Sequence, residues 1–561
     1  MLRTAKILSL LSLALATIFF LGIGRSTHSS AGLCWLLDSP QREYLSEAGA
    51  SFIAELCNAP LGALTPHRSS APRSVLNSVH NSALSSVLHA QTSTNITVNN
   101  PNTDTPENTT QSETTVAVFG ETVLVGFVDT GQALPLEPGI SSRSGLARSA
   151  DQGESFIDLG KAPPNPRAIG ISDPSLAVDS KGNFYLSTIQ QVPNGRNSES
   201  YMGVSRSTDD GQTFSPALLV AGFGPVDSAL QDKELIAVDH TGSTFDGNLY
   251  MTWTEFDTGG SHILFVRSTD GAQTFSKPSI LSDGRTSVQG ATPAVGPDGE
   301  VYIIWINFGQ RPDLRIRRSL DGGQTFEPER VVASLRLSSD PTSSNACGRR
   351  ALKGNIRHLE LPSVAVDLGK SPTRGTIYVT YSSDPDGNAG PDASDVYIVR
   401  SSDGGQSWSE AIRLNDDSTT SDQFQPAAAV ARDGTVGVIF YDRRLDPTNL
   451  NIDLYMTRST DGGQTWEVNT RVTDRSFSVP PIALNGRNFD NLRSICYMGD
   501  YNQMAADDEF FYLVWGDNRE TLFTDRFPAP NGRPDPNVFF AKIPVHNGTL
   551  SASPTGLRHA P

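Results

Sequence analysis

The chain has 561 residues, of which 37% are hydrophobic, and its formal net charge at pH 7 is −17. This composition is sufficient for a large buried core and excludes wholesale disorder. The negative charge argues against a nucleic-acid backbone or an anionic membrane face as the main partner, and four cysteines are too few for a disulfide-based scaffold.

The chain begins with a pattern typical of an export signal. Arg3 and Lys6 precede an apolar run from Ile7 to Ile23, and small residues at 29–31 provide a cleavage site. We therefore predict a signal peptide over residues 1–31. Because the apolar run is slightly long, an uncleaved N-terminal anchor is the alternative. No comparable run follows, so we expect no other contact with a membrane, and a secreted or extracytoplasmic location (periplasm or cell surface).

Residues 32–93 form an extension that precedes the repetitive part of the chain. Only 44–57 has the pattern of a short helix, and 65–94 is rich in Ser, Asn, Ala and His without a stable period. This composition predicts a flexible linker. An exported chain can form disulfides, for which Cys34–Cys57 and Cys347–Cys496 are the most economical pairs, although the sequence does not fix the connectivity.

An octapeptide of the form Ser-x-Asp-x-Gly-x-Thr/Ser-Phe/Trp occurs six times between residues 149 and 466, with Ala272 in place of Gly in the third copy. Each copy follows an extended segment, and most precede another, which predicts a β-turn between two antiparallel strands. In such a turn the Asp carboxylate accepts backbone hydrogen bonds, the Gly permits a positive φ, and the aromatic ring packs beside the turn. The six aspartates are Asp151, Asp209, Asp270, Asp321, Asp403 and Asp461.

The spacing of the octapeptides indicates a repeated four-stranded unit. Successive copies begin 51 to 82 residues apart, and each interval contains two further strands upstream of the turn. Such units predict a β-propeller. A seventh unit lacks the octapeptide but retains three strands, and ITVNN at 95–99 is a candidate for its fourth. We therefore predict an all-β fold with seven four-stranded blades over residues 94–545, closed by the N-terminal strand, with six blades as the alternative. Residues 546–561 form a C-terminal tail.

The octapeptide resembles the Asp-box, or bacterial neuraminidase repeat (BNR), of the sialidase superfamily of β-propellers, in its secreted bacterial type. The resemblance covers residues 94–545 and implies a sialidase-like propeller in which the six aspartates are structural turn residues rather than catalysts. Asp-boxes also occur in propellers that are not sialidases, so the fold alone does not determine the function.

The resemblance also implies a chemistry. Sialidases are retaining glycosidases with a Tyr nucleophile. In this family a Glu activates the Tyr, an Asp is the acid/base, and three Arg bind the substrate carboxylate. The family also carries an Arg-Ile-Pro motif before its first Asp-box. This chain has no such tripeptide, and Arg315-Ile316-Arg317 is the nearest string. That difference argues against ordinary exo-sialidase activity.

In a four-stranded meander the octapeptide turns lie at one end of the propeller, and the inter-blade links and second-to-third loops lie at the other. Several Arg, Tyr and carboxylate residues map to this second end, where Arg suits an anionic sugar and Tyr–carboxylate neighbours suit glycosidic chemistry. The candidates are Arg443, Arg444, Arg493 and Arg519 for substrate binding, Tyr497 or Tyr501 as nucleophile, and Asp442, Asp500 or Asp517 as acid/base. The alternative is that these residues form strand-end ion pairs that join the blades. Cys347 and Cys496 map to the same end, where a disulfide would hold a long loop over the centre.

Two hypotheses follow. The first is a secreted sialidase-like exo-glycosidase, a hydrolase of exo-α-sialidase type that acts on terminal anionic sugars. The second is a non-catalytic propeller that binds a glycan or a protein at the cell surface. A glycan or glycoconjugate is the expected partner, nucleic acid is not, and the oligomeric state stays open. We expect no cofactor and no metal, because the histidines are scattered and the oxygen-rich loop from Asp384 to Asp395 does not match the register of a calcium loop.

Overall fold

The computed structural model describes residues 34–46, 49, 53, 57, 94–104, 110–131, 141–194, 197–220, 229–284, 287–387, 391–478, 496–523 and 532–546. The predicted signal peptide lies outside these residues, as does the predicted C-terminal tail apart from His546. No helix in the described ranges is long and apolar enough to cross a membrane.

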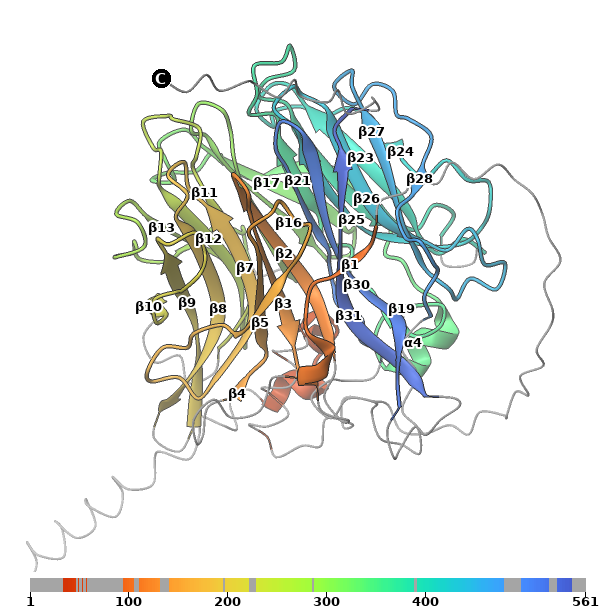
Figure 1. The fold of residues 1–561 in the computed structure, drawn as a ribbon, viewed down its shortest axis with the longest axis horizontal. Helices are drawn as coiled ribbons and strands as arrows, with labels where there is room; N and C mark the ends of the chain where they lie inside the picture. The colour runs from red at the N-terminus through yellow and green to blue at the C-terminus, as the bar shows by residue number, and fades with distance from the viewer. Residues whose placement is uncertain are drawn as a thin grey trace, which may run out of the picture.

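Seven four-stranded antiparallel sheets form the blades of a propeller (Figure 1). The first strand of each blade contacts the first strand of the next blade, and the first strand of blade 7 contacts that of blade 1. These seven strands therefore surround the propeller axis as a closed ring. The fold is an all-β propeller, and the prediction of seven four-stranded blades is confirmed.

The first four blades follow the chain in order, with the innermost strand first. Blade 1 contains β2 (Gln111–Phe119), β3 (Thr122–Asp129), β5 (Ser144–Ser149) and β6 (Ile157–Lys161). Blade 2 contains β7 (Gly170–Val178), β8 (Phe184–Asn194), β9 (Asn197–Ser207) and β10 (Leu218–Val220), with the short β4 (Ser141–Ser142) parallel to β7. Blade 3 contains β11 (Leu230–Val238), β12 (Leu249–Asp257), β13 (Gly260–Ser268) and β14 (Ser279–Ile280). Blade 4 contains β15 (Val288–Val295), β16 (Val301–Asn307), β17 (Asp313–Ser319) and β18 (Arg330–Ser334).

The last three blades follow a longer link that contains α4 (Pro341–Cys347) and the hairpin of β19 (Ala351–Leu352) and β20 (Ile356–Arg357). Blade 5 contains β21 (Ser363–Val366), β22 (Ile377–Ser383), β23 (Asp395–Ser401) and β24 (Ile412–Arg413). Blade 6 contains β25 (Gln423–Val430), β26 (Val436–Asp442), β27 (Asp453–Ser459) and β28 (Thr470–Arg471). Blade 7 contains β29 (Gln503–Ala506), β30 (Phe510–Leu522) and β31 (Arg533–Pro544), with β1 (Ile96–Thr97) as its outermost strand.

The N-terminal strand closes the ring. In β1, Ile96 pairs with Phe540 and Thr97 pairs with Phe539 of β31. A segment from before blade 1 thus completes blade 7, as the sequence ITVNN predicted. The two ends of the propeller are therefore hydrogen-bonded in one sheet.

Apolar residues of neighbouring blades pack against each other to form the core. β26 carries the sequence VGVIFYD and is buried along its whole length, which fits its β-branched and aromatic content. One cluster joins blades 6 and 7 through Ile439, Leu454, Phe511 and Trp515. The core is therefore a ring of interfaces between blades.

The six octapeptides form the same turn. In the fifth copy, Asp403 accepts hydrogen bonds from Ser401 Oγ at 2.7 Å and from the Ser407 backbone N–H at 3.0 Å. Gly405 N donates to Ser401 Oγ at 2.8 Å. Burial is the largest single influence on the Asp403 carboxyl and opposes its ionisation, but the hydrogen-bond donors together lower its pKa to about 2. The carboxylate therefore holds the turn together while it is ionised.

Two disulfides lie in the described part of the chain, Cys34–Cys57 and Cys347–Cys496. These are the two pairs expected from the sequence as the most economical connectivity. The first closes a loop in the N-terminal segment, which contains the short 3₁₀ helices η1 (Cys34–Asp38) and η2 (Pro40–Tyr44). The second joins the link that contains α4 to the link before β29. Figure 1 shows the red N-terminal segment and α4 at the same end of the propeller.

Candidate functional site

Five of the seven innermost strands carry a β-bulge near their start. The pairing register shifts at this point in β2, β7, β11, β15 and β25. The bulged residues all have a positive φ, which is rare for residues other than Gly. A bulge adds one residue to the strand and re-aims its side chain. The five residues, at equivalent positions around the axis, are Glu113, Asp173, Lys233, Gly290 and Gln425.

The bulges bring a cluster of charges together at the axis. Lys233 Nζ lies 2.6 Å from Asp500 Oδ2 and 3.3 Å from Glu113 Oε1. Arg357 Nη2, from β20, lies 2.8 Å from the same Asp500 oxygen. All four side chains are at most 3% exposed. We call Glu113, Lys233, Arg357 and Asp500 the central cluster.

Two carboxyl groups of the central cluster are driven to opposite protonation states. Burial raises the pKa of Glu113 to about 8, although Lys233 opposes this shift. Burial would also raise the pKa of Asp500, but Arg357 and Lys233 hold it at about 2. At neutral pH, Glu113 therefore keeps its proton and Asp500 is ionised. Separation of two carboxyl pKa values in this way occurs at acid/base catalytic sites and also in buried ion-pair networks.

A small cavity adjoins the central cluster on the axis, with a volume of about 50 Å³. Tyr501 lines this cavity, and its ring lies 5.2 Å from Lys233 Nζ. Glu234 also lines it. Within the described part of the chain, neither carboxyl oxygen of Glu234 has a hydrogen-bond partner, and burial raises its pKa well above the ordinary value. The cavity has room for a few water molecules but not for a sugar, since ligand pockets are typically about 300 Å³ or larger.

The N-terminal segment covers the end of the propeller axis at which the central cluster lies. Ser46 N donates to Asp232 Oδ2 at 2.7 Å, and Arg357 Nη2 donates to the Leu45 carbonyl at 2.6 Å. Leu45 packs with Leu230 and Phe256 of blade 3 in an apolar cluster. The composition of residues 32–93 predicted a flexible linker, whereas residues 34–46 lie packed on the propeller. The physical reason is that this part of the extension carries its own apolar residues and disulfide.

Three of the predicted arginines lie away from the central cluster, bound to carboxylates of this chain. Arg444 Nη2 lies 2.7 Å from Asp442 Oδ2, and its guanidinium lies 4.5 Å from the centre of the Tyr455 ring in the third strand of blade 6. Arg443 Nη1 donates to Asp422 Oδ2 at 3.0 Å and to the Lys353 carbonyl at 2.8 Å.

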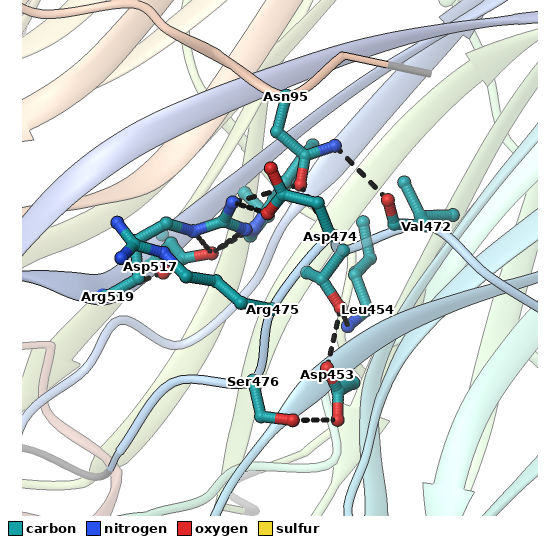
Figure 2. Close-up of polar contacts among 12 residues, drawn as sticks. Asn95, Asp453, Leu454, Val472, Asp474, Arg475, Ser476, Asp517 and Arg519 are labelled. Atoms are coloured by element: carbon teal, nitrogen blue, oxygen red, sulfur yellow. Dashed lines mark hydrogen bonds and ion pairs between the residues drawn. The ribbon is translucent and has the colours of Figure 1, made fainter. Parts of the chain in front are cut away.

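Arg519 has an equivalent arrangement in blade 7. Its Nη2 lies 2.6 Å from Asp517 Oδ2, and its Nη1 donates to Asn95 and to Asp474 (Figure 2). Asp474 follows β28 of blade 6, so the pair of Asp517 and Arg519 joins two blades. Arg493 lies outside the described residues.

The two tyrosines predicted as nucleophiles differ in whether they reach the cavity. Tyr497 is fully buried, and its hydroxyl oxygen accepts a hydrogen bond from Ser112 Oγ at 3.3 Å. Tyr501 lines the cavity, and burial raises the pKa of its hydroxyl well above the ordinary value. Of the predicted site residues, the structure brings Asp500, Tyr501 and Tyr497 together at the axis. It places Asp442 and Asp517 on the second strands of blades 6 and 7, each beside its arginine.

Sequence reasoning did not select Glu113, Asp173, Lys233 or Glu234 as site residues. Each lies in the first strand of a blade, and these strands are separated by about 60 residues in the chain. One signal was available: several first strands have a polar first half that contains charged residues and an apolar second half, as Glu113 shows in QSETTVAVF and Lys233 shows in LQDKELIAV. A charged bulge in a central strand is costly unless it has a partner on another blade.

The disulfide Cys347–Cys496 supports the central cluster. Arg357 N donates to the Cys496 carbonyl at 2.8 Å, and Asp500 follows Cys496 by four residues. The bridge therefore fixes the two links that supply Arg357 and Asp500. Within the described ranges no group of three or more His, Cys, Asp or Glu is arranged to hold a metal ion, and residues 388–390 of the oxygen-rich loop lie outside these ranges.

The chain was compared with known proteins. No family model and no curated protein match it. A protein of unknown function from Dyadobacter fermentans is 16% identical over 62% of this chain and 93% of that chain, with a TM-score of 0.39. A leech intramolecular trans-sialidase is 13% identical over 67% of this chain and 69% of that chain, with a TM-score of 0.41. The endosialidase of phage phi92 is 11% identical over 84% of this chain and 71% of that chain, with a TM-score of 0.43. These similarities concern the fold alone.

Proposed function

We propose that this protein is a secreted glycoside hydrolase of the sialidase-like propeller type, which removes a terminal sugar at the central cluster after the N-terminal segment that covers the cluster has moved away. The observation that carries this proposal is the opposed protonation of Glu113 and Asp500 on either side of Lys233. Hydrolysis of a glycosidic bond needs a group that gives a proton to the leaving oxygen and a second group that stabilises or attacks the sugar carbon. Glu113 suits the first role.

For the second role we propose Tyr501, with the ionised Asp500 beside it in the chain. Tyr501 lines the cavity, whereas Tyr497 is fully buried. A tyrosine hydroxyl with a raised pKa is a weak nucleophile and needs a neighbouring carboxylate as base. Carboxyl groups of Glu113, Asp173 and Glu234 all influence the Tyr501 hydroxyl electrostatically. Glu113 is assigned to the first role and burial raises the pKa of Glu234, so we propose Asp173 as the base.

A sialidase reaction on an anionic sugar is one form of this activity, and the balance of charge disfavours it. The cations of the central cluster, Lys233 and Arg357, are both already paired with Asp500. Arg443, Arg444 and Arg519 are bound to carboxylates elsewhere. A neutral sugar therefore suits the site better than a sugar acid, because an added carboxylate has no unshared Arg among these residues.

The second candidate function is a non-catalytic glycan-binding propeller. One observation favours it: the central ion pairs are complete and the N-terminal segment covers them. In this case the charges would stabilise the centre of the ring of blades, and the glycan would bind at the outer edge of the propeller.

The test is an assay of the purified full chain with fluorogenic glycosides of neutral sugars, uronic acids and sialic acid. We expect release from a neutral glycoside, and a loss of about 100-fold or more in kcat for Glu113→Gln and Tyr501→Phe. Tyr397→Phe is the matched control, because Tyr397 lies in the third strand of blade 5, away from the axis. No turnover of any glycoside would reject the hydrolase in favour of the binding propeller. Full activity in Glu113→Gln would reject the assigned role of Glu113.

A further inference from the structure

Ser46 of the N-terminal segment is bound to a buried carboxylate of blade 3. Ser46 N donates to Asp232 Oδ2 at 2.7 Å, and Ser46 Oγ donates to Asp232 Oδ1. Gln289 Nε2 of blade 4 also donates to Asp232 Oδ2, at 3.2 Å. Both Ser46 and Asp232 are fully buried. The two oxygens of one carboxylate are thus bound by two donors that belong to a single residue.

The donors of Ser46 have the geometry of a sugar diol. The atoms N–Cα–Cβ–Oγ of a serine form the same four-atom unit as the O–C–C–O of a vicinal diol, with one donor at each end. A carboxylate that accepts both donors of the first unit can accept both hydroxyls of the second, and such charge-assisted hydrogen bonds are stronger than neutral ones. Asp232 is adjacent in sequence to Lys233 of the central cluster, so a diol bound to Asp232 would lie close to Glu113 and Tyr501.

Two further contacts of the segment are of the kind that a sugar makes. The ring of Tyr44 stacks on Phe308, with 4.3 Å between centroids and an angle of 14° between the planes. Arg357 Nη2 donates to the Leu45 carbonyl at 2.6 Å. A sugar ring can place its C–H face on an aromatic ring and a hydroxyl oxygen on an Arg. Residues 44–46 therefore cover an aromatic face, a cation and a carboxylate that lie together at one end of the axis.

We propose that Asp232, Arg357 and Phe308 form a binding subsite for a neutral sugar with a vicinal diol, and that residues 44–46 occupy this subsite and compete with the sugar. The inference rests on the proposed function for the identity of the ligand as a sugar. A neutral sugar is favoured because an anionic one would bring its carboxylate to Asp232, while Arg357 is already paired with Asp500.

Substitutions in the segment can weaken the cover without changing the propeller. Gly49 N donates to Ser46 Oγ at 3.0 Å, and a Cβ at position 49 would lie 3.0 Å from Leu230 Cδ2 and 3.2 Å from Asp232 Oδ1. Gly49→Val therefore displaces the segment by steric contact. Ser46→Ala removes the hydroxyl donor to Asp232. Asp232→Asn keeps the shape of the carboxylate but removes its charge and one acceptor, and it weakens both the cover and the subsite.

The experiment measures sugar binding to the full chain, and hydrolysis of the bound glycoside is followed separately. Methyl β-galactoside, methyl α-mannoside and the methyl glycoside of sialic acid are titrated by calorimetry into wild type and the three variants. Hydrogen exchange over residues 34–46 is recorded in parallel. We expect faster exchange in all three variants. We expect Gly49→Val and Ser46→Ala to bind a neutral glycoside about tenfold more tightly than wild type, which is about 1.4 kcal/mol. We expect Asp232→Asn to bind it about tenfold or more weakly than Gly49→Val.

The outcomes separate this inference from the proposed function. Equal affinity of Gly49→Val and wild type would overturn the competition. Equal affinity in Asp232→Asn and Gly49→Val would overturn the subsite, as would preference for the sialoside or absence of neutral-sugar binding in every variant. If Asp232→Asn does not fold, the comparison of Gly49→Val with wild type still decides the competition. Tight binding of a neutral glycoside without its hydrolysis would leave the subsite in place and reject the hydrolase.

Discussion

The Asn95 amide oxygen accepts a hydrogen bond from Arg519 Nη1 at 3.0 Å, although the two residues are 424 positions apart in the chain. Asn95 also donates from Nδ2 to the Val472 carbonyl at 3.1 Å and accepts from the Asp474 backbone N–H at 3.0 Å (Figure 2). Asn95 directly precedes β1, which completes blade 7, while Val472 and Asp474 belong to blade 6. The closing strand is therefore bonded to both of the last two blades.

Disruption of this contact should loosen the ring. We expect Asn95→Ala to lower the free energy of unfolding by about 1–3 kcal/mol, because three hydrogen bonds are lost. Arg519→Ala should cost more, about 3–5 kcal/mol, since it leaves the buried Asp517 carboxylate without its cation. Urea unfolding followed by tryptophan fluorescence measures both values.

Arg475→Ala is the matched control for Arg519→Ala. Arg475 directly follows Asp474 after β28 and pairs with Glu520 at 2.6 Å, but both side chains are about half exposed. An exposed pair of this kind contributes less than about 1 kcal/mol. Similar losses in Arg475→Ala and Arg519→Ala would contradict the role of burial in joining blades 6 and 7.

The octapeptide turns should make the propeller sensitive to acid. The pKa of Asp403 is about 2 in the folded chain, below its ordinary value of 3.8. The folded state therefore favours the ionised form, so the stabilisation is present above pH 4 and is lost as the pH falls towards 2. We expect Asp403→Asn to have a lower melting temperature than wild type at pH 5. At pH 2.5 the difference between the two melting temperatures should be smaller. Asp508→Asn, which removes an exposed carboxylate paired with the exposed Arg432, is the control and should shift neither value. Parallel pH curves for wild type and Asp403→Asn would contradict the prediction.

The blades and their closure could be predicted because their signals are local or repeated. The octapeptide marks the turn between the third and fourth strands of six blades, and ITVNN has the composition of a strand without a local partner. The position of β1 follows from the number of strands, because the seventh unit has only three strands of its own and one strand precedes the first unit. Apart from β1, the strands of each blade pair with strands that are their neighbours in the chain, so chain order is sufficient to assign them to blades.

The candidate site could be predicted only in part, because it depends on how the seven innermost strands meet. Asp500 and Tyr501 were found from the content of one link. Glu113 and Lys233 come from bulges 120 positions apart, and nothing in either strand alone identifies its partner. For Arg444 and Arg519 the sequence shows an Asp two residues earlier in each case. This spacing fits an ion pair within one strand end as well as a binding site, and only the structure shows those ion pairs.

Glu113 should make stability depend on pH in the neutral range. Its pKa is about 8 in the folded chain, above the ordinary 4.5, so the folded chain holds a proton that the unfolded chain releases. Stability should therefore fall as the pH rises from about 4.5 to 8, by at most about 1.4 kcal/mol per pH unit for this one proton. Glu113→Gln should flatten the fall. Glu234, whose pKa is also raised by burial, contributes in the same direction, so Glu113→Gln with Glu234→Gln should flatten it further. Urea unfolding at pH 5, 6, 7 and 8 measures the slope, and an unchanged slope in the double variant would contradict the prediction.

The two disulfides should act on different parts of the molecule. Cys347–Cys496 closes a sequence separation of 149 residues and holds the links that carry Arg357 and Asp500. Replacement of both cysteines by Ser should lower the free energy of unfolding of the propeller by about 2–4 kcal/mol, because the unfolded chain gains the freedom of a long loop. Cys34–Cys57 lies in the N-terminal segment, with a sequence separation of 23. Its replacement should leave the unfolding of the blades nearly unchanged and should speed hydrogen exchange over residues 34–46. Mass spectrometry resolves the two effects peptide by peptide. A cooperative loss of protection in all seven blades after removal of Cys34–Cys57 would show instead that the segment is part of the core on which the propeller depends.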